Sequence, residues 1–168
     1  MNAMSPFPVV NQDDAAPRCA DARWDPHRFR SQMLDKFAEI ETWAVGRLRA
    51  AHPDKKLAPM LGLRFDAVRQ LTETHAHLFK DAPAVAKLLD ELRPLHDLRS
   101  TLAHAVLTIV SPANGPRIAL FDRADRDGEM PWLGRIALFE DDRRRIIGKV
   151  SDLANQLSQQ VRAPKPER

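Results

Sequence analysis

Arg99 and His104 are the two side chains of this sequence whose types and spacing best fit chemistry on a phosphodiester. A guanidinium keeps its positive charge and can hold two phosphate oxygens in one plane. An imidazole titrates near neutral pH, so it can act as the acid or the base when RNA is cleaved through its 2′-hydroxyl. Both residues fall in an apolar segment with helical periodicity. These are the groups that metal-free cleavage of RNA would use; the alternative explanation is a structural ion pair of Arg99 with a half-exposed helix histidine at 104.

A helix would place these side chains on different sides. At about 100° per residue, Arg99 falls on the apolar stripe and His104 lies roughly 140° around the helix from it. Ser100 and His104 are one turn apart on the adjoining polar face. Burying Arg99 is costly without an anionic partner, and Glu91 and Asp97 are the nearest candidates in the sequence. One Arg and one His supply too little acid–base machinery alone, and a two-fold dimer would double the set.

The segment Leu98-Arg99-Ser100-Thr101-Leu102-Ala103-His104 resembles the Arg-x4-6-His signature of the HEPN superfamily, whose members commonly read L-R-N-x-x-A-H in their third core helix. The resemblance implies an all-α bundle, often homodimeric, with paired motifs lining a cleft and metal-independent RNase activity in many members. It makes Arg99 and His104 the catalytic pair. Ser100 then occupies a position that is often Asn, Asp or His in active members. Here the sequence departs from the pattern, and some HEPN proteins are non-catalytic.

Two functions remain open on this resemblance. The first is a homodimer that cleaves or binds RNA in a bacterial stress, toxin–antitoxin or phage-defence setting, with an antitoxin or another protein as partner. Arg99 would then contact phosphate and His104 would act as general acid or base. The second is a non-catalytic module in which the same helix forms a dimer interface and a hairpin binds a protein partner. The second function explains more simply why serine stands at position 100, because a non-catalytic module does not need the residue found in active members.

Four segments with apolar residues at helical spacing must position the pair. The first carries its stripe from Phe29 to Leu48, after Asp25-Pro26 as N-cap and first helical residue. The second runs from Leu61 to Leu78. The third runs from Val85 to about Val110, with a kink expected at Pro94, and the fourth from Asp141 or Asp142 to about Val161.

A short repeat lies between the third and fourth segments. Arg117-Ile118-Ala119-Leu120-Phe121 recurs as Arg135-Ile136-Ala137-Leu138-Phe139, and Asp125-Arg126-Asp127-Gly128 supplies turn chemistry between the copies. This pattern predicts a β-hairpin at about residues 117–139. The expected fold class is all-α, an HEPN-like four-helix up-and-down bundle with a β-hairpin inserted before the last helix.

Length and composition favour one domain. The 168 residues suffice for one well-buried core, so we expect a disordered N-terminal arm over 1–25, a helical domain over 26–162 and a flexible tail over 163–168. The net charge of +3 permits contact with a polyanion but does not decide the question. The single Cys19 cannot form an internal disulfide, which fits a reducing cytoplasm. No apolar run or signal-peptide pattern indicates contact with a membrane.

Other motifs give weaker signals. Thr74-His75-Ala76-His77 places its histidines on different sides of a helix without a carboxylate cluster, so we expect neither a metal nor a cofactor. The segment 122–128 fails as a calcium loop because Arg123 occupies its first ligand position. Arg143-Arg144-Arg145 could touch phosphate, although a solvated helix end is the commoner explanation. Trp132, beside Pro131 on the hairpin, is expected at a partner surface.

Overall fold

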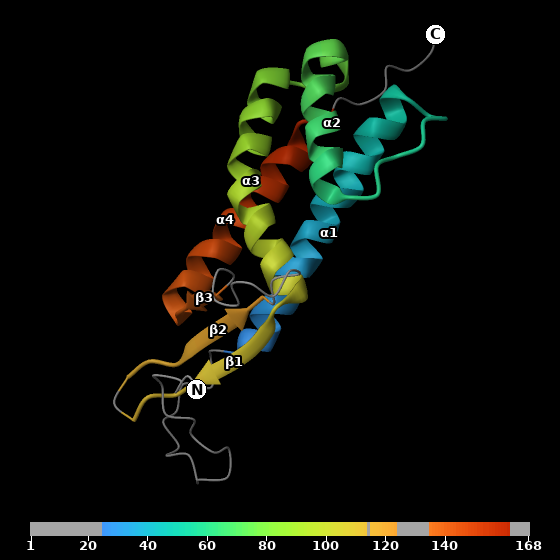
Figure 1. Cartoon of the computed structure of the whole chain (residues 1–168). Coiled ribbons are helices and arrows are strands. Elements are labelled where there is room, and N and C mark those ends of the chain that lie inside the picture. The colour runs from blue at the N-terminus through green and yellow to red at the C-terminus, as the bar shows by residue number, and fades with distance from the viewer. Residues whose placement is uncertain (1–24, 114, 124–134, 162–168) are drawn as a thin grey trace.

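A computed structural model of the chain describes residues 25–113, 115–123 and 135–161. Four helices lie alongside one another and a small sheet lies at one end of them (Figure 1). The predicted mostly helical fold with a β element before the last helix is therefore confirmed. In chain order the elements are α1 (Pro26–Ala51), α2 (Leu61–Thr74), the 3₁₀ helix η1 (Ala76–Leu78), α3 (Ala82–His104), β1 (Val106–Val110), β2 (Ile118–Asp122), β3 (Arg135–Leu138) and α4 (Glu140–Gln159).

Helix α1 is the central element and begins as its sequence predicts. The Asp25 carboxylate accepts the backbone N–H of His27 at 2.9 Å and of Arg28 at 3.2 Å, and Pro26 follows the cap. Such a cap satisfies donors that have no partner within the helix. Helix α1 packs against α2, α3 and α4. Its predicted apolar stripe is buried throughout, as Phe29, Met33, Phe37, Ile40, Ala44 and Leu48.

The remaining helices pack around α1 in chain order. Helix α2 contacts α3, and α3 contacts α4. At the far end from the sheet, Phe79 forms an isolated antiparallel bridge with Val161, and the Lys80 N–H donates to the Gln160 carbonyl at 3.0 Å. This contact fixes the connection between α2 and α3 against the end of α4. No helix among the described residues is long and apolar enough to cross a membrane.

The third helix ends earlier than the sequence predicts. Helix α3 continues through Pro94 and stops at His104, where the following Ala105 N–H donates to the Thr101 carbonyl at 2.8 Å. The prediction of helix as far as Val110 was wrong, because the β-branched run that follows pairs with β2 as a strand. In this strand Val106 is 68% exposed.

The sheet has three antiparallel strands in the order β1-β2-β3. The two predicted hairpin strands are present as β2 and β3, but β1 was missed, so the prediction of a two-stranded hairpin was incomplete. Successive residues of β2 point to opposite faces: Ala119 and Phe121 are buried, whereas Leu120 is half-buried. The register aligns Val106, Thr108, Val110, Ile118, Leu120, Asp122, Arg135 and Ala137 on the other side, which we call the outer sheet face.

Helix α4 is the last of the four helices and packs against α1 and α3. It begins at Glu140, one or two residues before the predicted start at Asp141 or Asp142, and the Phe139 N–H donates to the Asp142 carboxylate at 3.1 Å. The acidic first turn also complements the helix dipole. Val150, Leu153 and Leu157 are buried, as their spacing predicts. The expected N-terminal arm as far as residue 24, the hairpin turn, Trp132 and the tail from residue 162 lie outside the described residues.

Candidate functional site

The C-terminal end of α3 carries all three residues that the sequence singles out. Arg99 and Ser100 are half-buried, whereas His104, the last residue of the helix, is exposed. A contact from α1 holds this end in place, because the Arg30 Nη2 donates to the Ala103 carbonyl at 3.0 Å. The beginning of α1 and the end of α3 therefore lie together.

Arg99 has a buried nitrogen without a partner. Among the described residues, its Nε is buried and makes no hydrogen bond. The two carboxylates expected to pair with it are placed elsewhere: Glu91 lies 3.4 Å from the Lys149 ammonium, and Asp97 lies 3.6 Å from the His96 ring. Leaving a buried donor unsatisfied costs about 1–3 kcal/mol. The protein encloses this nitrogen, so an anionic ligand would contact the half-buried guanidinium through its other nitrogens.

His104 and Ser100 share a face of α3 that Arg99 does not. Because α3 is continuous from Ala82 to His104, the five-residue spacing puts Arg99 and His104 roughly 140° apart around the helix axis. No hydrogen bond joins Ser100 to His104 in the described part of the chain. A single chain thus brings Ser100 and His104 to one side of α3 and leaves Arg99 on the packing side. One copy of α3 therefore does not present Arg99 and His104 to the same phosphate.

A groove of about 230 Å³ between α2 and α3 is lined by three carboxylates and two guanidinium groups. Asp66 accepts from Arg93 at 2.8 Å, and Asp90 accepts from Arg69 at 3.1 Å. The hydrogen bond to Asp90 and its negative charge raise the pKa of Arg69 above its usual value. Since each of these cations faces its own carboxylate, the groove offers an anion no unpaired charge from them.

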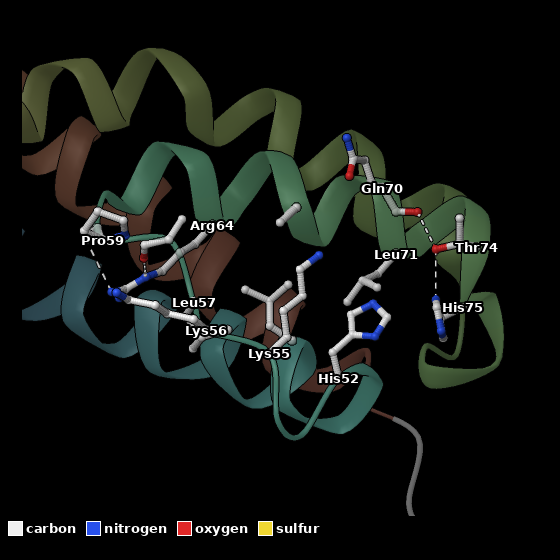
Figure 2. A pocket seen from close by; sticks show the side chains of 13 residues that line it. His52, Lys55, Lys56, Leu57, Pro59, Arg64, Gln70, Leu71, Thr74 and His75 are labelled. Carbon is white, nitrogen blue, oxygen red and sulfur yellow. Dashed lines mark hydrogen bonds between the residues drawn. The ribbon is translucent and has the colours of Figure 1, made fainter.

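A larger pocket, which the sequence did not predict, lies at the other end of α1. It has a volume of about 630 Å³ and is enclosed by the end of α1, the loop over residues 52–60 and α2 (Figure 2). The signal in the sequence is the run from His52 to Lys56, which interrupts the apolar periodicity between the first two helical segments. A cluster of His and Lys in such a loop is compatible with a surface turn or an anion site, and only the packing of α2 beside it makes a cavity.

Two weaker motifs find structural explanations. Arg144 is paired with Glu140 at 2.7 Å and Arg145 with Asp142 at 2.8 Å, as expected for a solvated helix end. His75 caps α2, and its ring centroid lies 6.0 Å from that of His77. Within the described residues, no group of three or more His, Cys, Asp or Glu side chains could hold a metal ion.

Comparisons with family models, with curated proteins and with solved structures found no match to this chain. Its function must therefore be argued from its own residues and their geometry.

Proposed function

We propose that this chain is an HEPN-like protein, an up-and-down helical bundle that works as a homodimer and binds RNA at the ends of its α3 helices, where it cleaves the RNA without a metal. The observation that carries the proposal is the buried Arg99 Nε, which has no hydrogen-bond partner among the described residues. A phosphate oxygen is the acceptor that such a guanidinium binds best. The bacterial stress, toxin–antitoxin or phage-defence setting belongs to the same proposal.

His104 has the position required of a proton donor or acceptor. It is exposed, and it ends α3, where the helix dipole favours a positive charge. Ser100, one turn before it, can donate a hydroxyl hydrogen bond to a phosphate oxygen. Because Arg99 lies on a different side of α3, a two-fold pairing of helix ends is what would join one guanidinium and one imidazole in a shared cleft.

The test is cleavage of a mixed RNA substrate by the full-length protein in EDTA. We expect 2′,3′-cyclic phosphate ends, and we expect His104→Ala to slow cleavage by about 10²–10⁴-fold, the usual contribution of a general acid or base. His77→Ala is the matched control, because His77 is also exposed and lies just before α3 begins, at the other end of that helix from His104. A folded wild type that neither cleaves nor binds RNA would contradict the proposal, as would an unimpaired His104→Ala variant.

A second candidate function is a non-catalytic dimerisation or protein-interaction module. The outer sheet face favours it: Val106 is 68% exposed and Val110 is 36% exposed on the same side of the edge strand β1. An edge strand presents unpaired backbone donors and acceptors, which a second strand can pair with. A continuous sheet across two copies would satisfy the backbone of this edge and give these valines cross-strand side-chain neighbours.

Val110→Lys is expected to weaken self-association by tenfold or more, because its cross-strand neighbour Ile118 offers no counter-charge and burying an unpaired ammonium in an interface is costly. Sedimentation over a range of protein concentrations measures the effect. Leu63→Lys is the control, since Leu63 is an exposed apolar residue on α2, away from the sheet. A wild type that remains monomeric, or equal dimerisation by both variants, would contradict a dimer through this face. Dimerisation without RNA cleavage or binding would favour the module over the nuclease.

A further inference from the structure

The pocket between α1, the 52–60 loop and α2 has an apolar interior. Leu48, Leu57, Ala67 and Leu71 contribute to its walls, and its volume of about 630 Å³ falls within the ordinary range for small-molecule sites. Of the described residues that line it, none is acidic. The pocket therefore combines a surface that prefers apolar groups with a lining whose ionisable members are all basic.

Two of these cations have no counter-charge. The side chains of Lys55 and Lys56 are exposed, and their ammonium groups make no hydrogen bond or ion pair with the described residues. Figure 2 shows the Lys55 side chain and the His52 ring extending from the α1 side toward α2. Both groups can donate hydrogen bonds to an anion that enters between them.

Arg64, the arginine of the lining, has a different role from the two lysines. It forms an ion pair with Glu41 of α1, and its Nε donates to the Ala58 carbonyl at 2.6 Å. Arg64 thus joins α2 to α1 and to the loop. Its charge is neutralised, and the loop that carries Lys55 and Lys56 is held in position by this contact.

The opposite rim is also fixed before any ligand binds. The Thr74 hydroxyl donates to the Gln70 carbonyl at 3.0 Å, so it is left to accept a hydrogen bond from the His75 Nδ1 at 2.9 Å. The His75 ring meets the His52 ring edge-on, with centroids 5.0 Å apart. Because this rim is already ordered, the protein loses less conformational entropy when a ligand binds.

From these observations we propose that the pocket binds a small amphipathic carboxylate, with its apolar body against the leucines and its carboxylate beside Lys55 and Lys56. The site is separate from the proposed RNA site. It lies at the C-terminal end of α1, whereas Arg30, near the N-terminal end, contacts the end of α3. Helix α1 has 26 residues and so spans roughly 40 Å.

The experiment is titration of the full-length protein with octanoate, followed by calorimetry and by the shifts of backbone amide signals. We expect saturable shifts over residues 52–75. Octyltrimethylammonium, with the same chain and the opposite charge, and acetate, with the same charge and no apolar body, should both bind about tenfold more weakly or worse. Equal binding of octanoate and octyltrimethylammonium would overturn the proposal, because the cations would then contribute nothing.

Separate variants test the two lysines and the apolar interior of the pocket. Lys55→Ala/Lys56→Ala should weaken octanoate about tenfold, whereas Lys80→Ala/Lys87→Ala removes the same charge from exposed positions outside the pocket and should leave the affinity unchanged. Ala67→Leu, which fills the pocket without changing charge, should also weaken octanoate. An unchanged affinity in both pocket variants, or amide shifts confined to residues elsewhere, would overturn the proposal. None of these outcomes depends on whether the protein cleaves RNA.

Discussion

Replacing Arg99 with Met should stabilise the folded protein by about 1 kcal/mol and, in the same variant, lower RNA binding and cleavage by tenfold or more. Met keeps much of the aliphatic stem of Arg99 but removes the buried Nε, which has no hydrogen-bond partner among the described residues. Replacing an unsatisfied polar group by an apolar one of similar shape commonly improves stability. Urea unfolding measures the first effect, and RNA titration with cleavage in EDTA measures the second.

Arg47→Met is the matched control for this experiment. Arg47, on α1, also has a buried Nε without a hydrogen-bond partner in the described part of the chain. Its replacement should give a similar gain in stability and leave RNA binding and cleavage unchanged. If Arg99→Met gained stability and kept its activity on RNA, the guanidinium would have no role in the proposed site. If it lost several kcal/mol instead, Arg99 would be a structural residue of the folded chain.

Phe121→Ala should cost about 3–5 kcal/mol of unfolding free energy, which is the range for removing a buried phenyl ring from a packed core. Phe121 is 0% exposed and sits on the central strand β2, opposite Leu107 of β1 and Ile136 of β3. It belongs to the same buried cluster as the helices, so it anchors the sheet to them. The midpoint of urea unfolding should fall sharply, together with any activity that depends on the sheet.

Leu120→Ala provides the comparison within the same strand. Leu120 precedes Phe121 and lies on the outer sheet face, where it is half-buried. Its removal should cost about 1–2 kcal/mol, less than Phe121→Ala, because the side chain is smaller than a phenyl ring and stays partly in contact with water. Equal losses in the two variants would contradict the assignment of one buried and one open face. The expected difference therefore tests the orientation of the sheet as well as its contribution to stability.

Local patterns alone predicted much of the helical structure. The stripe from Phe29 to Leu48 has the period of a helix and is buried throughout, and Asp25 caps that helix through its own carboxylate. The repeated segments that contain Ile118 and Ile136 became adjacent strands. These features depend on residues a few positions apart, so the sequence carries the information directly.

The end of α3 was decided by tertiary structure. Val106 and Ile109 continue the helical spacing of Leu102, which is why the sequence indicated a longer helix. The same residues are β-branched, and the antiparallel partner Ile118–Asp122 is what makes the strand the better conformation. A local pattern compatible with both structures cannot choose between them, because the choice depends on hydrogen bonds to residues 8 to 16 positions further along the chain.

The sequence by itself determined which residues could do chemistry, namely Arg99, Ser100 and His104, and placed them on one helix. Only the tertiary structure decided what surrounds them: Glu91 and Asp97 pair elsewhere, which leaves the Arg99 Nε without a partner among the described residues. The pocket beside Lys55 likewise exists only because α2 folds back along α1. Partner choice and cavity shape depend on side chains brought together from distant parts of the chain, and no periodicity or spacing within one segment encodes those distances.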